Sequence, residues 1–209
     1  GGVRLTSVPV EDIKVQVGSD TPVSFAEAVN NNWVQAGVFK YGQTTGYELA
    51  DNVAPFEGYW MRCLKKPAAR LVFDPVGTSA VASSVNGERA LPDPDWSLRI
   101  VAQTASGMSS SAYMGVASEA TDGFDVRYDM ESPPSFASGV SARFVGEGDV
   151  GSARRITDVR SLRQTATTWR LRVKSDIPDS PVQVSWPDLS TVPDDVQPIL
   201  HDPDAGQSV

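Results

Sequence analysis

Apolar and polar residues alternate without a break in several short stretches of this chain. The clearest stretch is 169–173 (WRLRV), and residues 182–186 (VQVSW) repeat the pattern. A period of two places successive side chains on opposite faces of the backbone. Each stretch therefore predicts a half-buried antiparallel strand and excludes an amphipathic helix. The same alternation predicts strands at 96–102 and 140–144.

The sequence before residue 75 predicts shorter strands and one short helix. Ser24 and Glu27 have the spacing of a capping box, in which the Ser24 side chain accepts a hydrogen bond from the third backbone amide of the helix. The helix is expected near 24–30 and is stopped by three consecutive asparagines at 30–32. Strands are expected at 13–17, 33–39, 47–49, 58–64 and 70–73.

The composition changes between the two sets of strands. Gly, Ser, Ala and Asn dominate from residue 76, and the stretch closes with LPDPD at 91–95, which is typical of a linker or surface loop. We therefore expect an all-β fold: an antiparallel β-sandwich or jelly roll, built as two packed β subdomains with one short helix. The expected parts are a small β subdomain over 1–75, a linker or long loop over 76–95, and a β-sandwich over 96–209.

Charge and hydropathy limit the partners. The 209 residues include 26 acidic and 18 basic side chains, for a net charge of -8. Because proteins bind phosphate backbones by neutralising them with Lys and Arg, we expect no nucleic-acid partner. No run reaches the roughly 18 apolar residues that a spanning helix needs, so membrane insertion is not expected either.

The residues that usually carry catalysis are scarce. His201 is the one histidine, and it lies in a polar turn without a Gly-x-Ser-x-Gly motif. His201 and the one cysteine, Cys63, are too few for a zinc site, and Cys63 is expected to be a small buried hydrophobe. Paired carboxylates across a cleft, as in jelly-roll glycosidases, stay an alternative, but most carboxylates fall in turn-like segments. We therefore expect that the protein is not an enzyme.

One acidic segment is a candidate metal site. Asp122, Asp125 and Asp129 lie in one predicted loop that also contains Gly123 for a tight bend. Calcium takes six to eight oxygen ligands, which carboxylates and backbone carbonyls of such a loop can supply. No other cofactor is expected. The alternative, which we favour, is that these aspartates form Asx-turns that stabilise a long connection.

The aromatic residues divide into core and candidate binding positions. Trp96, Trp169 and Trp186 occupy the apolar phase of their strands, which predicts that they belong to the core. Tyr59 and Trp60 are adjacent, so they point to opposite faces of a strand and one of them can be exposed. Exposed rings can stack on sugars. The candidate ligand-binding residues are Tyr41, Tyr47, Tyr59 and Trp60.

The order of several motifs resembles a known kind of protein module. The segments are PVSFAEAV at 22–29, EGYW at 57–60 and DGFD at 122–125, followed by a double proline and by VQVSW at 182–186. From about Thr21 to the end, the chain resembles accessory β-sandwich modules of large secreted multidomain bacterial surface proteins. Such modules often precede a C-terminal immunoglobulin-like or type IX sorting domain. The resemblance implies an extracellular or cell-surface location, and no single activity.

These observations favour a non-catalytic extracellular β-sandwich module that acts as a structural, assembly or adhesion unit. Its expected partners are other domains or copies of the same surface protein, or a polysaccharide. The alternative is a carbohydrate-binding module that recognises a polysaccharide through exposed aromatic residues. An enzyme would require a cleft with converging carboxylates.

Overall fold

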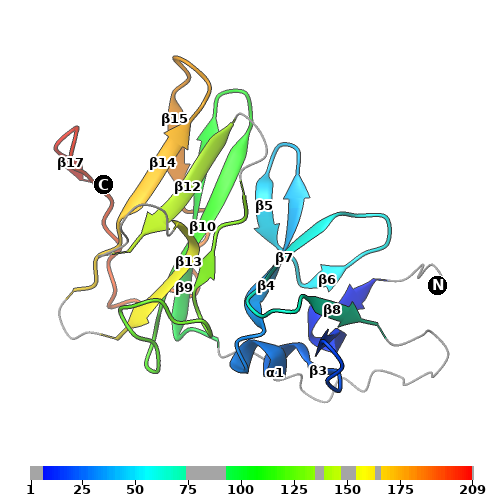
Figure 1. Cartoon of the computed structure of the whole chain (residues 1–209). Helices are drawn as coiled ribbons and strands as arrows, with labels where there is room; N and C mark the ends of the chain where they lie inside the picture. The colour runs from blue at the N-terminus through cyan, green and yellow to red at the C-terminus, as the bar shows by residue number, and fades with distance from the viewer. Residues whose placement is uncertain (1–6, 74–92, 135–138, 147–153, 163–165, 209) are drawn as a thin grey trace.

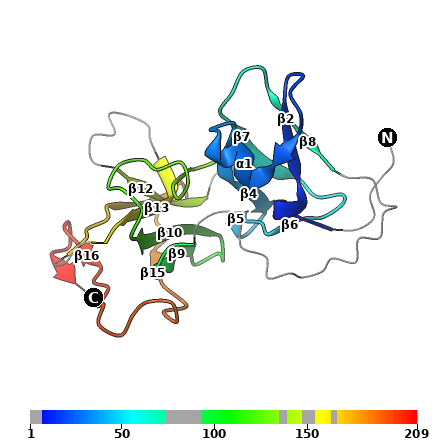
Figure 2. The ribbon, with the colours of Figure 1, turned by 90° about the horizontal axis from the view of Figure 1, so that it is seen from below.

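The computed structural model describes residues 7–73, 93–134, 139–146, 154–162 and 166–208, and its regular structure is almost entirely β (Figure 1). This confirms the predicted all-β fold with several antiparallel sheets. Figure 2 shows the two halves of the chain lying next to each other, with the helix in the N-terminal half. Within the described ranges, no helix has the length and apolar content needed to cross a membrane.

The N-terminal half contains three small antiparallel sheets. Their strand orders are β1-β6, β3-β2-β8 and β5-β4-β7. The longest strand, β4, carries six consecutive buried residues at its start, because both of its faces are covered there. The strands are β1 (Val8–Pro9), β2 (Lys14–Val17), β3 (Val23–Ser24), β4 (Val34–Gly42), β5 (Gly46–Leu49), β6 (Asn52–Val53), β7 (Tyr59–Cys63) and β8 (Ala69–Val72).

One α-helix is present among the described residues, at the place predicted from the sequence. Helix α1 spans Phe25–Asn30, and a short 3-10 turn, η1, precedes β2 at Val10–Asp12. The Ser24 hydroxyl accepts a hydrogen bond from the Glu27 backbone N–H at 3.2 Å, which confirms the predicted N-cap. The side chains of α1 that face the core recur at helical spacing: Phe25, Ala28 and Val29.

The C-terminal half is built around a seven-stranded sheet with the order β14-β12-β13-β10-β9-β15, and β11 pairs with β13 beside this path. Its strands include all four alternating stretches identified in the sequence. They are β9 (Trp96–Thr104), β10 (Ser109–Ala117), β11 (Met130–Glu131), β12 (Val140–Val145), β13 (Arg154–Ser161), β14 (Leu171–Ser175) and β15 (Val182–Ser185).

One strand pair in this sheet differs from the antiparallel expectation. Strands β10 and β13 are parallel, in register from Tyr113 opposite Thr157 to Ala117 opposite Ser161. A parallel pair requires a long crossover connection, and the chain between these strands is long enough to include β11 and β12. Strand periodicity reveals which residues face the core, but it carries no information on which strand lies alongside.

The sheet curves so that its two edge strands contribute to one apolar cluster. Buried side chains of β9, β10 and β12 form the centre, and half-buried residues of β14 and β15 pack against it. A neighbouring cluster contains Trp96, which is buried, and half-buried Trp169 and Trp186 pack against it. The predicted core placement is therefore confirmed for Trp96, whereas Trp169 and Trp186 lie at the edge of the core. The central residues are Ile100, Ala102, Ala112, Ala142 and Phe144.

The segment after β15 folds back onto the sheet. Val192 and Val196 pack against the cluster that contains Trp96, and the Thr191 hydroxyl donates a hydrogen bond to the Ser97 carbonyl. The described chain ends in an exposed two-stranded hairpin formed by β16 (His201–Asp202) and β17 (Gln207–Ser208).

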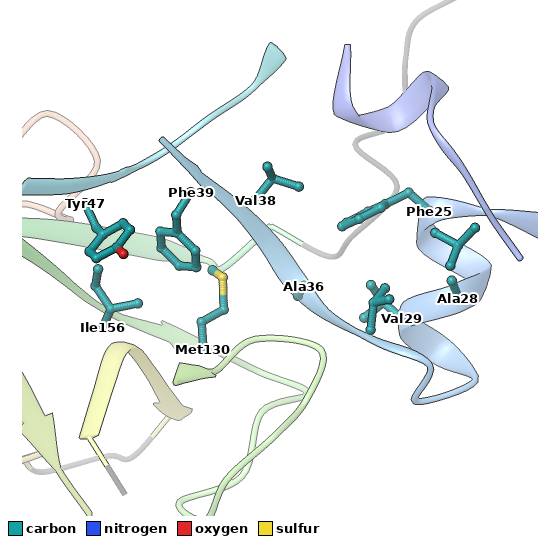
Figure 3. Packing of buried hydrophobic residues seen from close by; sticks show 11 residues of the cluster. Phe25, Ala28, Val29, Ala36, Val38, Phe39, Tyr47, Met130 and Ile156 are labelled. Atoms are coloured by element: carbon teal, nitrogen blue, oxygen red, sulfur yellow. The ribbon is translucent and has the colours of Figure 1, made fainter. Parts of the chain in front are cut away.

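The two halves share a hydrophobic cluster. Met130 and Ile156 of the C-terminal half belong to the cluster that β4, β5 and α1 build in the N-terminal half. In Figure 3, Met130 and Ile156 lie beside Phe39 and Tyr47. Most of the predicted linker, 76–95, lies outside the described residues. The structure therefore shows the connection between the halves through their side-chain contacts and not through the linker.

Polar contacts surround this shared cluster. Arg62 of β7 forms an ion pair with Glu131 of β11, and Arg99 of β9 forms one with Glu48 of β5 at 3.1 Å. The Ser109 backbone N–H also donates to the Thr44 carbonyl at 2.7 Å. Because the ion pairs are partly exposed, each one adds little to the free energy of unfolding. Their main effect is to fix the orientation of one half relative to the other.

Truncation of Met130 to Ala tests the energetic coupling of the halves. Met130 is 8% exposed, so we expect its truncation to lower the free energy of unfolding by about 2–5 kcal/mol through lost burial and a residual cavity. Urea denaturation measures the change. Leu162→Ala is the control, because Leu162 is 66% exposed and should change stability by less than about 0.5 kcal/mol. Equal effects of the two substitutions would contradict the shared core.

Candidate functional site

Two of the candidate aromatic residues lie together on the β4–β5 hairpin. Tyr41 and Tyr47 are directly opposite each other across the two strands, and their rings meet edge to face with centroids 5.1 Å apart. Tyr41 is 40% exposed, whereas Tyr47 is 6% exposed and packs with Phe39 in the shared cluster. Of this pair, Tyr41 therefore offers a ring surface to solvent, and Tyr47 is a core residue.

The other two candidates occupy opposite faces of β7, as adjacent residues of a strand must. Trp60 lies opposite Phe39, with ring centroids 5.9 Å apart, and both Trp60 and Tyr59 are half-buried against the shared cluster. The Tyr59 hydroxyl donates to Glu57 at 2.7 Å and accepts from the Ala54 N–H at 2.8 Å. The structure thus does not bring the four predicted residues together as a row of exposed rings.

The structure does not bring the three aspartates of the candidate calcium site together as one group of ligands. Among the described residues, no three side chains of His, Cys, Asp or Glu converge in a way that could hold a metal ion. Asp122 accepts a hydrogen bond from the Ser161 hydroxyl at 2.8 Å, and Asp125 caps a turn by accepting from the Arg127 N–H at 3.2 Å. Asp129 is fully buried. The three carboxylates separate because each one has its own hydrogen-bonding role within the protein.

Asp129 belongs to a buried network of charges that the sequence analysis missed. Its Oδ1 accepts from the Val159 N–H at 2.8 Å, and its Oδ2 accepts from the Asp125 N–H at 2.9 Å and from Arg155 at 3.3 Å. Arg155 also bonds to Asp158 at 3.2 Å. The loop before β11 is therefore anchored to β13 by both backbone and charge-assisted hydrogen bonds.

The network continues along β13 to the aromatic core. Asp158 bonds to Arg160 at 3.1 Å, and the Arg160 guanidinium lies 5.8 Å from the centre of the Trp169 ring. The Trp169 indole N–H donates to the Asp158 carbonyl at 3.0 Å. Two buried aspartates and two buried arginines contact one another, so removing either arginine should destabilise the fold by leaving a buried carboxylate with fewer partners. In the sequence, this network could have been recognised from the charged residues at the alternate positions 158 and 160 of a strand-like stretch.

The remaining chemistry-bearing residues lie apart from this network. His201 is exposed and shares a 3.0 Å hydrogen bond with the Ser208 hydroxyl in the terminal hairpin. Cys63 is exposed, contrary to the sequence expectation, because it ends strand β7 and its thiol takes part in hydrogen bonds with the Lys65 carbonyl and the Ala69 N–H.

A strained aromatic residue lies in the loop between β6 and β7. Phe56 is 86% exposed and has a backbone φ of +64°. Asn and Asp tolerate this left-handed region, as Asn32 and Asp179 do here, but a bulky aromatic residue rarely adopts it. Backbone strain of this kind has an energetic cost and clusters at functional sites. In the sequence, residues 55–58 (PFEG) have the composition of a turn and so indicate a loop. This composition does not reveal the sign of φ at Phe56.

No family model matches the chain, and neither a search of curated proteins nor a search of solved structures found a match.

Asp129 makes the stability of the protein depend on pH. Burial raises its pKa from 3.8 to about 7, and the hydrogen bonds from Asp125, Val159 and Arg155 only partly oppose this effect. Because the folded state then binds more protons than the unfolded state between about pH 4 and 7, this group lowers the free energy of unfolding as pH rises through that window. We expect Asp129→Asn to remove this contribution, which is of the order of a few kcal/mol.

Urea denaturation at several pH values between 4 and 8 measures the effect. The free energy of unfolding of wild type should fall by a few kcal/mol relative to that of Asp129→Asn as pH rises from about 4 to 8. Asp20→Asn, at an exposed turn position, is the control and should follow the wild-type profile. A constant difference between wild type and Asp129→Asn across this range would refute the assignment.

Phe56→Gly tests the backbone strain in its loop. Glycine adopts positive φ without steric cost, so the substitution should raise the free energy of unfolding by up to about 1 kcal/mol even though it deletes a large side chain. Thermal denaturation measures the gain. Phe73→Gly is the control, because Phe73 is also exposed but is not among the residues with positive φ, and its substitution should bring no gain. A loss of stability in Phe56→Gly would mean that the ring packs against the protein.

Proposed function

We propose that this chain is a non-catalytic extracellular module that acts as a structural, assembly or adhesion unit of a secreted or cell-surface bacterial protein. The observation that carries the proposal is the cluster shared by the two halves. A unit that transmits force or holds other domains apart must resist bending between its parts. The Met130 and Ile156 contacts, flanked by two ion pairs, supply such a joint.

Two further features support the proposal. The order of sequence motifs resembles accessory modules of large bacterial surface proteins, whose setting is extracellular. Phe56 also presents an apolar ring at a loop tip, and exposed aromatic rings are frequent anchors of protein–protein contacts. Its partner would be another domain or another copy of the same surface protein.

Carbohydrate binding is the second candidate function. The observation that favours it is the Tyr41 ring, which is partly exposed and is held in place by Tyr47 beneath it. A ring fixed in this way loses little conformational entropy on binding a flat partner such as a sugar face.

Single-molecule force spectroscopy on the whole chain tests the proposed structural role. We expect one unfolding step that releases both halves together, because they share buried side chains. Met130→Ala should convert this step into two at a lower force, since it weakens the joint while leaving each half's own core intact. Two independent steps in the wild-type chain would contradict a single structural unit.

The proposed location has a separate test. Antibodies against the folded chain should label intact, unpermeabilised cells that produce the protein, or detect it in their medium. Labelling that appears only after permeabilisation would contradict an extracellular role.

A further inference from the structure

Three strands of the C-terminal half place positive charges on one face of the sheet. Along β14, Arg172 and Lys174 alternate with Leu171 and Val173, which join the apolar cluster behind the sheet. Arg170 precedes the strand, and its carbonyl accepts a hydrogen bond from the Val145 N–H of β12. Since side chains two residues apart point to the same face, these three cations share the face opposite the core.

The register of the neighbouring strands adds two cations to this face. Arg143 of β12 lies directly opposite Arg172 of β14. Arg154 of β13 lies opposite Val145, two residues from Arg143 and on the same face. We call the five residues Arg143, Arg154, Arg170, Arg172 and Lys174 the basic face.

The basic face has little internal neutralisation. Lys174 pairs with Asp176 at 2.6 Å, but no ion pair links any of its four arginines to a carboxylate in the described part of the chain. Elsewhere arginines usually pair, as Arg62, Arg99 and Arg127 do. Arg143 is part-buried and donates hydrogen bonds to the Ser110 hydroxyl at 3.2 Å and to the Ala142 carbonyl at 2.7 Å, so Arg154, Arg170 and Arg172 are the exposed arginines of this face. A cluster of arginines without carboxylate partners among the described residues stands out in a chain whose net charge is -8.

This arrangement costs stability. Like charges directly opposite each other on neighbouring strands destabilise a sheet, and Arg143 and Arg172 occupy such a pair. Burial, and then the charge of Arg154, lower the pKa of Arg143 to about 10. Charged side chains on an edge strand also discourage aggregation, and this role would explain the cations on β14. Protection of an edge does not explain the cations on β12 and β13, because neither of these is an edge strand.

An exposed aromatic ring borders the basic face. The Thr44 carbonyl of the β4–β5 hairpin accepts a hydrogen bond from the Ser109 N–H of β10 at 2.7 Å, and the hydroxyl of the next residue, Ser110, accepts one from Arg143 at 3.2 Å. Tyr41 stacks edge to face on Tyr47 and is 40% exposed. The β4–β5 hairpin thus brings one partly exposed aromatic ring to the Arg143 side of the basic face.

We propose that the basic face binds a linear acidic polysaccharide through carboxylate or sulfate groups on successive sugars. The planar guanidinium group matches such anions with two parallel hydrogen bonds, and arginines dominate the face. Alternate side chains on β14 repeat about every 7 Å, so a chain with regularly spaced anions can meet several of them. Single-stranded nucleic acid is disfavoured, because it requires several stacking rings and the described strands of the face carry none. The inference rests on the proposed adhesion role and gives it a ligand.

Isothermal titration calorimetry with defined polymers tests the proposal. The probes are polygalacturonate for carboxylates, dextran sulfate for sulfates, and neutral dextran as a control. We expect one or both anionic polymers to bind at about 50 mM salt and to weaken strongly at about 300 mM, while neutral dextran does not bind. Which anionic polymer binds more tightly identifies the anion.

Matched charge reversals locate the site. The double variant Arg170→Glu/Arg172→Glu should weaken binding about tenfold or more, because it replaces two exposed contacts with repulsive charges. Arg70→Glu is the control, since Arg70 is an exposed arginine on β8 in the other half. Circular dichroism in the near ultraviolet should show unchanged folding for both variants. Equal weakening by Arg70→Glu would overturn the assignment to the basic face.

Two other results would also overturn the proposal. One is the absence of binding to both anionic polysaccharides. The other is tighter binding of polyglutamate or of a thymidine oligonucleotide, which would indicate an acidic polypeptide or a nucleic acid instead. Neither result changes the single unfolding step that force spectroscopy should show for a structural module. The binding experiments therefore test the ligand, and the force experiment separately tests the proposed function.

Discussion

The packing of Met130 between the two halves depends on the bonds that its neighbour Asp129 makes. Asp129 is fixed by the Val159 and Asp125 amides and by Arg155, so the loop before β11 has a defined end. The next residue, Met130, then enters the cluster built around Phe39 in the N-terminal half. A buried charge is thus tolerated because it positions an apolar contact. Without that anchor, Ile156 would be the buried side chain of the C-terminal half that holds the shared cluster, together with partly exposed ion pairs that contribute little stability.

The same strand, β13, serves three purposes through residues at every second position, from Arg154 to Arg160. Ile156 contributes to the shared core, whereas Asp158 and Arg160 join the charge network that reaches Trp169. Arg154, at the start of the strand, belongs to the basic face. The core, the charge network and the basic face are therefore mechanically linked. An anion bound to the basic face would rest on the strand that also holds the two halves together, which suits an adhesion unit under load.

The arginines of this protein are of two kinds, which differ in burial and in whether a carboxylate lies beside them. Arg155 and Arg160 are buried and neutralised, so they act within the fold. Arg170 and Arg172 are exposed and have no carboxylate partner in the described residues, so their field extends into solvent. Net charge alone led us to expect no nucleic-acid partner. It does not describe the basic face, because a local field acts on a ligand even where the whole chain is acidic.

The sequence by itself determined the strands, the short helix and the core position of Trp96, because alternation and capping are properties of neighbouring residues. It placed Trp96 and the helix that begins after Ser24 correctly. Only the tertiary structure decided the partner of each strand, the fate of the acidic loop and the positions of the charges. Asp129 looks like a metal ligand in the sequence, yet it is buried, where it meets Arg155 and the Val159 amide, 26 and 30 positions along the chain, as well as the nearby Asp125 amide. Arg143 and Arg172 are 29 positions apart, and the strand register that makes them neighbours arises from packing that no local pattern encodes.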